Sequence, residues 1–199
     1  MHKQLSLESY TNLLGSSQPS PGGGSAAAII AANAIALCEM VCRLNAKRIK
    51  SYSNHWVSLS RAKRFEKARQ ACLNLSDADT RAFEAVSKYW KTGGEDLQQA
   101  LKTASQTPLQ LAELITQNAI LAVNEIEPTS KHLISDLAEA GLFFKSTFES
   151  AVMNVRINLL SIEDSVFVAA QERKIANLKH QICSASDQLI ASFALKHAE

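Results

Sequence analysis

Two long stretches of the chain contain neither glycine nor proline: residues 25–92, 68 in number, and residues 142–199, 58 in number. Leu, Ala, Gln, Glu and Lys, which favour helices, dominate both stretches. The few Val and Thr residues do not alternate with the period of two that half-buried strands require. Strands would also need turns, which glycine and proline usually mark. The pattern therefore predicts long α-helices and an all-α bundle.

The glycines and prolines divide the chain into its predicted elements. Six of the eleven fall between Gly15 and Gly24, so a Pro/Gly-rich turn precedes the first long helix. A length of 199 residues suits one core, and we expect a single domain over residues 1–199 made of long antiparallel helices. The predicted helices are a short one within 6–14, then 25–51, 54–90, 97–104, 108–127, 129–160 and 162–196. Residues 74–77 can cap a new helix within 54–90. Thr107 is the expected cap of the helix that begins at Pro108, and Ser161 is the expected N-cap of the last helix.

Charge and hydropathy narrow the function classes. Lys and Arg number 21 against 19 Asp and Glu, a formal net charge of +2 that implies no nucleic-acid partner. The longest strongly apolar run, Ala26–Cys38, has 13 residues, fewer than the roughly 20 that span a membrane. Residues 1–6 lead into no apolar secretion signal. We therefore expect a cytoplasmic protein without a membrane partner.

The sequence gives little support for a metal site or for a Ser-His-Asp catalytic triad. Cys38 and Cys42 are four residues apart on an apolar helix, a spacing more typical of buried thiols than of zinc ligands, and the chain has no CxxC pair. The five histidines are scattered and no nucleophile elbow is present, which argues against a Ser-His-Asp hydrolase. We expect no metal site.

The segment Pro19–Ala28 is unusual for a helix bundle, because it contains three consecutive glycines. Bare amides in such a turn, and a helix N-terminus capped by Ser25, can hold an anion or a flat ligand. A flexible linker is the alternative, although Pro19 and Pro21 stiffen the entry and a buried helix follows. Glu39 falls near the same face of that helix as a stripe of small residues. The predicted ligand contacts here are Pro21, Gly22, Gly23, Gly24, Ser25 and Glu39.

A second departure is a polar stripe on the predicted helix 129–160. Asp136, Asn154 and Asn158 point within about 40° of one direction, on the same face as Phe143. Asp136 and Asn154 are 18 residues apart, or about 27 Å along a straight helix, so they cannot contact one small ligand within one chain. Either only one end of the stripe takes part in catalysis or binding, or two different subunits supply its two ends to one site. A solvated Asp with two structural Asn residues remains the alternative.

These segments, together with several others, resemble the cyclodeaminase/cyclohydrolase family of folate enzymes. Each motif is weak alone, but all occur in the family's order and at about its spacing. The motifs are Pro19–Ala28, Glu39-Met40-Val41, Asp79-Thr80-Arg81-Ala82-Phe83, Thr107-Pro108-Leu109, Ser135-Asp136-Leu137 and Asn154-Val155-Arg156-Ile157-Asn158-Leu159.

The resemblance implies an all-helical enzyme that binds a tetrahydrofolate derivative, forms homodimers or larger homo-oligomers with sites near subunit contacts, and uses Asp136 of the Ser135-Asp136 motif as its catalytic acid. The expected activity is hydrolysis of 5,10-methenyltetrahydrofolate to 10-formyltetrahydrofolate. The alternatives are a formimidoyltetrahydrofolate cyclodeaminase and a helical folate-binding or scaffold protein without turnover. Cations for the glutamyl tail of folate would be Lys47, Lys50 and Lys131.

The expected chemistry needs few protein groups. A methenyl bridge is a delocalised cation that water attacks at carbon, so the enzyme must position the water and supply a carboxylate base. No metal, covalent nucleophile or cofactor beyond the tetrahydrofolate substrate is required.

Overall fold

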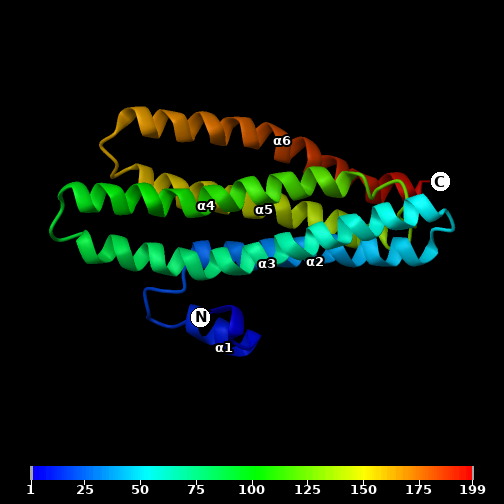
Figure 1. The fold of residues 1–199 in the computed structure, drawn as a ribbon, viewed down its shortest axis with the longest axis horizontal. Coiled ribbons are helices and arrows are strands. Elements are labelled where there is room, and N and C mark those ends of the chain that lie inside the picture. The colour runs from blue at the N-terminus through cyan, green and yellow to red at the C-terminus, as the bar shows by residue number, and fades with distance from the viewer. Residues whose placement is uncertain (1, 199) are drawn as a thin grey trace.

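The computed structural model describes residues 2–198, and within this range the chain folds into helices with no strand (Figure 1). The all-α prediction is confirmed. The elements are η1 (His2–Gln4), α1 (Leu7–Leu14), α2 (Gly23–Arg48), α3 (Tyr52–Tyr89), α4 (Gly94–Val123), α5 (Ile134–Leu159) and α6 (Ser165–His197).

Helices α2 to α6 run up and down in chain order, so that consecutive helices are antiparallel (Figure 1). α2 packs against α3 and α5, and α4 packs against α3 and α5, which closes a ring of four helices. α6 covers α4 and α5 from outside this ring. α1 lies outside the ring of four helices, on the side of α2 and α3, and η1 contacts α3 (Figure 1).

The core joins large side chains of α3 and α5 to small ones of α2. Phe65, Phe144 and Phe148 are fully buried in one core cluster with the alanines and cysteines of α2. By length and composition alone, α2 could cross a membrane, but most of its apolar part is buried inside the bundle. The central position of α2 in a helical core accounts for the same composition.

The predicted break at Pro108 is wrong, because α4 is one helix that continues through this residue. A proline inside a helix removes one backbone hydrogen bond and crowds the preceding turn. Pro108 is buried, and Leu101, Leu109 and Ala112 on both sides of it pack into the core. Burial on both sides of the proline therefore outweighs the local cost.

Other helix ends also differ from the prediction. α2 begins at Gly23 with Gly22 as its N-cap, so Ser25 is not the cap. α6 is capped by Asp164, whose side chain accepts the Phe167 N–H, and not by Ser161. α5 begins at Ile134, and α3 continues without a break through 74–77.

The unequal lengths of α2 and α3 create space at one end of the bundle. α3 has 38 residues and α2 has 26. At about 1.5 Å per residue, α3 is longer by about 18 Å and extends past the glycine turn at the start of α2. The last turns of α3 therefore have no contact with α2, and a cavity lies beside them.

Candidate active site

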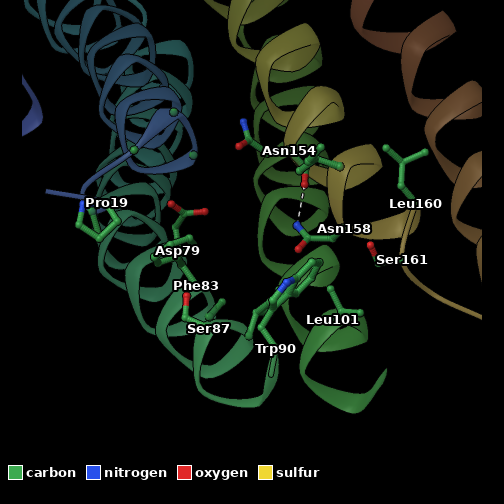
Figure 2. A pocket seen from close by; sticks show the side chains of 18 of the residues that line it. Pro19, Asp79, Phe83, Ser87, Trp90, Leu101, Asn154, Asn158, Leu160 and Ser161 are labelled. Atoms are coloured by element: carbon green, nitrogen blue, oxygen red, sulfur yellow. Dashed lines mark hydrogen bonds between the residues drawn. The ribbon is translucent and has the colours of Figure 1, made fainter. Parts of the chain in front are cut away.

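A cavity of about 680 Å³ lies where the glycine turn, the end of α3, the start of α4 and the end of α5 meet (Figure 2). Its walls come from segments far apart in the sequence. The lining residues are Pro19, Ser20, Gly22, Gly23, Gly24, Asp79, Ala82, Phe83, Val86, Ser87, Trp90, Lys91, Leu101, Ala104, Asn154, Ile157, Asn158, Leu160 and Ser161.

Asp79 is the acid among the lining residues, and it lies directly against the glycine turn. A Cβ atom on Gly24 would collide with the Asp79 carboxylate, so this approach requires glycine. Burial raises the pKa of the Asp79 carboxyl, while a hydrogen bond from the Ser25 backbone N–H and the charge of His2 lower it; the pKa stays above its usual range. The carboxylate is therefore held in place and keeps its proton to higher pH than an exposed aspartate.

Two amides of α5 face Asp79 from the opposite wall (Figure 2). Asn154 donates to the Ser150 carbonyl and Asn158 to the Asn154 carbonyl, both at 2.8 Å. Each bond occupies one amide hydrogen, so each side chain keeps a carbonyl oxygen and a second hydrogen with which to contact a ligand. A Cβ on Gly23 would lie 3.9 Å from the Asn154 amide, an ordinary contact distance.

Aromatic and aliphatic side chains form the outer part of the cavity. Phe83 and Trp90 follow Asp79 along one face of α3 and remain 45% and 58% exposed. Ile157, 63% exposed, lines the cavity from α5. Large exposed apolar side chains around a half-buried carboxylate suit a flat ligand with a polar or cationic centre.

The structure brings together part of the predicted site. Gly22, Gly23 and Gly24 line one cavity with Asn154 and Asn158. The two other predicted residues of the glycine turn, Pro21 and Ser25, are buried within and behind it.

The other predicted residues lie at the opposite end of the bundle. α5 is continuous, so Ser135 and Asp136 in its first turn are far from the cavity beside its last turns. Lys47 lies in the last turn of α2, Lys50 in the connection between α2 and α3, and Lys131 in the connection before α5. Within one chain none of these residues lines the cavity, and their roles, including that of Asp136 as catalytic acid, stay predictions.

Glu39 lies between the two ends and is already paired. It accepts hydrogen bonds from Arg43 at 2.8 and 3.0 Å and from Arg69 at 2.9 Å. Burial by itself would raise the pKa of the Glu39 carboxyl, but these bonds hold the pKa below its usual range. The structure therefore places Glu39 in an ion-pair cluster between α2 and α3, outside the cavity.

Sequence reasoning missed Asp79, Phe83 and Trp90 as site residues. Two signals could have found them. α2 and α3 form an antiparallel pair that turns near residue 50, so a residue about 26 positions before the turn faces one a similar distance after it, which matches Gly24 with the region of Asp79. Asp79, Phe83 and Trp90 also recur at helical spacing on one face.

Groups of three or more His, Cys, Asp or Glu side chains that could hold a metal ion do not occur within residues 2–198. Cys38, Cys42, Cys72 and Cys183 are all free thiols. Burial raises the pKa of the Cys72 thiol to about 12, and it also raises those of Cys38 and Cys42. These three thiols behave as core side chains.

The fold and the cavity define a class: a helical bundle that holds one carboxylate and two amides in a largely apolar cleft beside a glycine turn. The sequence profile of the formiminotransferase-cyclodeaminase family matches residues 6–177, and the chain belongs to this family. The resemblance drawn from the sequence motifs is confirmed.

Three relatives show how the match extends. The chain is 31% identical over 183 residues to a methenyltetrahydrofolate cyclohydrolase of Methylorubrum extorquens, covering 86% of this chain and 88% of the relative. It is 31% identical over 185 residues to the formimidoyltransferase-cyclodeaminase of Rattus norvegicus, covering 87% of this chain but 34% of that longer protein. The crystal structure of a formiminotetrahydrofolate cyclodeaminase from Thermotoga maritima superposes with a TM-score of 0.92, at 28% identity and 98% coverage of both chains.

Proposed function

We propose that this protein is an enzyme that hydrolyses 5,10-methenyltetrahydrofolate to 10-formyltetrahydrofolate in the cavity beside the glycine turn. The observation that carries the proposal is the Asp79 carboxylate, which is half-buried against Gly24 and has a raised pKa. The relative that this chain matches over nearly its whole length is named for this reaction.

The cavity offers a group for each requirement of the reaction. Water forms a bond to the methenyl carbon and Asp79 accepts the proton that this water loses. The new hydroxyl then loses its proton and becomes the formyl C=O while the bond from that carbon to N5 breaks; N5 takes up a proton and the formyl group stays on N10. A base works best when its pKa approaches the working pH, so the raised pKa of Asp79 suits this role.

The surrounding residues orient the ligand. Phe83 and Trp90 can stack on the flat rings of a folate, and the amides of Asn154 and Asn158 can hydrogen-bond its polar edge. The ionised Asp79 also attracts the methenyl cation, an attraction that strengthens where water is excluded.

A second candidate reaction uses the same residues as a cyclodeaminase. The N10 amine would attack the formimino carbon and ammonia would leave, which requires an acid to protonate the leaving nitrogen. The raised pKa of Asp79 favours this candidate too, because a carboxyl that keeps its proton to higher pH can donate it. The T. maritima structure of the same fold is named for this activity.

One experiment separates the candidates. Purified protein is incubated with methenyltetrahydrofolate while the near-ultraviolet absorbance of the methenyl group is followed, and with formiminotetrahydrofolate while ammonia is measured. Faster loss of absorbance than in buffer supports the cyclohydrolase, and ammonia release supports the cyclodeaminase. If neither reaction accelerates although folate binds, the chain is a binding or scaffold protein.

We further propose a homodimer or larger homo-oligomer in the cytoplasm. Leu142, Met153, Ile157 and Leu160 of α5 and its C-cap are 53%, 69%, 63% and 80% exposed, an apolar surface that a second copy could cover. Four cysteines without a disulfide fit a reducing compartment. Light scattering on the purified chain tests the first point, since a monomer at micromolar concentration would contradict it.

A further inference from the structure

The N-terminal segment, residues 2–14, lies against the back of the glycine turn. The His2 backbone N–H donates to the Asp77 carboxylate of α3 at 2.7 Å, and the Lys3 ammonium donates to the Asn74 side chain at 2.8 Å. From α1, Tyr10 is buried to 5% exposure and its ring meets that of His2 edge-on at 5.8 Å between centroids. The segment is therefore fixed to the bundle from two sides.

Ser25 connects this segment to Asp79. Its hydroxyl is fully buried and lies 2.7 Å from the Ser76 hydroxyl, 3.2 Å from the Tyr10 hydroxyl and 3.3 Å from Nδ1 of His2. Its backbone N–H is the donor that holds the Asp79 carboxylate. A single residue thus contacts both the N-terminal segment and the acid of the cavity.

The N-terminal segment and the Asp79 carboxylate also interact electrostatically. The charge of His2 lowers the pKa of Asp79, against the larger raising effect of burial. Burial raises the pKa of the Tyr10 hydroxyl, a hydrogen bond with Ser25 lowers it, and the Asp79 charge raises it further. The titratable groups that face His2 are Asp77 and Asp79 from α3 and Tyr10 from α1, while α2 contributes the uncharged Ser25.

We propose that His2 is a positioning residue of the active site, which together with Tyr10 fixes Ser25 under Asp79 and, in its protonated form, supplies a positive charge that acts on that carboxylate. The catalytic consequence rests on the proposed function of Asp79, but the coupling itself does not. The family match begins at residue 6, so His2 lies outside the matched residues.

The proposal has a definite consequence for pH dependence. The protonated imidazole of a histidine carries a positive charge, and the neutral one does not. The charge then favours the ionised form of Asp79 at the pH where the carboxylate would otherwise take up a proton. His2 therefore extends the activity of an Asp79 base toward lower pH.

The test compares His2→Gln, which removes the charge, with His2→Arg, which keeps a positive charge at every pH. The control is Lys3→Gln, which breaks the neighbouring contact to Asn74 without touching Ser25. Two readouts are recorded on the full chain. The first is the carboxyl ¹³C titration of Asp79, with its resonance assigned by its loss in Asp79→Asn. The second is the pH profile of kcat/KM with methenyltetrahydrofolate.

In His2→Gln we expect Asp79 to titrate at higher pH and the acid limb of kcat/KM to move with it. One pKa unit corresponds to tenfold in rate on the limb, so a loss of about 3- to 10-fold on the limb, with no change above pH 8, is expected. His2→Arg and Lys3→Gln should titrate at or below the wild-type position.

The outcomes separate this inference from the proposed function. A moved Asp79 titration with an unmoved rate profile supports the coupling and removes Asp79 as the catalytic base. An Asp79 carboxyl that titrates identically in wild type and His2→Gln overturns the inference, whatever the activity. Should His2→Gln not fold, an upward shift of the Asp79 titration in His2→Arg would overturn it equally.

Discussion

Each end of the bundle holds a carboxylate, fully buried at one end and half-buried at the other, and the two carboxylates have different partners. At the end where α4 meets α5, Glu125 is completely buried and accepts hydrogen bonds from Arg61 at 2.7 Å and Asn45 at 2.9 Å. At the glycine-turn end, Asp79 is held by a backbone N–H and borders a cavity. A buried carboxylate paired with a guanidinium stabilises a junction, whereas one desolvated beside an open cleft has a raised pKa and is available to a ligand.

This contrast also bears on the two aspartates that compete for the catalytic role. Asp136 is half-buried in the first turn of α5, and Asp79 faces the last turns of the same helix. The two acids are separated by most of the length of α5. If both act on one substrate, a second subunit must bring its Asp136 end to this cavity.

The largest expected effect separates these aspartates. We expect Asp79→Asn to lower kcat for methenyltetrahydrofolate by about 10²–10⁴, the usual contribution of a general base, because an amide cannot accept the proton of the attacking water. Asp136→Asn serves as the matched variant at the other end, and we expect it to change kcat far less. Steady-state kinetics with circular dichroism on both variants tests this. Equal losses would place both acids in one site shared by two subunits.

The glycine turn provides the next comparison, between adjacent residues. Gly24→Ala would push the Asp79 carboxylate out of position, and misplacement by about 1 Å can cost about 100-fold in rate. Gly23→Ala places its Cβ at 3.9 Å from Asn154, an ordinary contact, and should keep most activity. The measurement is kcat/KM of the two variants. Similar losses in both would mean that the turn contributes flexibility and not a close approach to Asp79.

At the other end, the expected effect is on stability. Arg61→Ala leaves Glu125 buried without its cation and should cost about 2–3 kcal/mol, somewhat less than for fully buried pairs because the Arg61 side chain is 24% exposed. Arg156→Ala breaks an exposed pair with Glu172 and should cost less than about 1 kcal/mol. Urea unfolding of both variants gives the difference. If the two variants lose equal stability, Glu125 does not depend on Arg61.

These comparisons also explain what the sequence could predict. Glycine and proline positions delimit long helices, so the bundle, the glycine turn and the polar stripe on α5 followed from local pattern. The distance along a helix also predicted correctly that Asp136 and Asn154 lie apart. The continuous helix through Pro108 could not be predicted, because burial on both sides of the proline is a tertiary effect.

The residues of the candidate site could be predicted only by knowing which residues of α2 and α3 lie next to each other. Asp79 lies within one of the quoted motifs, yet nothing local separates it from Asp77, which is buried two residues earlier and binds the His2 backbone. Asp79 is distinguished by its neighbour Gly24, whose missing side chain leaves room for the carboxylate. Such a difference appears only when α2 and α3 are placed side by side.

The smallest expected effect concerns stability against pH, and its sign follows from the raised pKa of Asp79. Between the ordinary pKa of an aspartate and this raised value, the folded protein holds a proton that the unfolded chain has released. The free energy of unfolding therefore falls as the pH rises through this window and stays lower above it.

Asp79→Asn has no charge to bury and can still accept the Ser25 N–H, so it avoids this loss. We expect its melting temperature to equal that of the wild type below about pH 4, where an aspartate is protonated, and to exceed it at pH 7 to 8. Asp136→Asn gives the comparison at the other end of α5. Thermal melts of the three proteins from pH 4 to pH 8 decide, and an Asp79→Asn variant less stable than the wild type at pH 8 would show that the ionised carboxylate stabilises the glycine turn more than its burial costs.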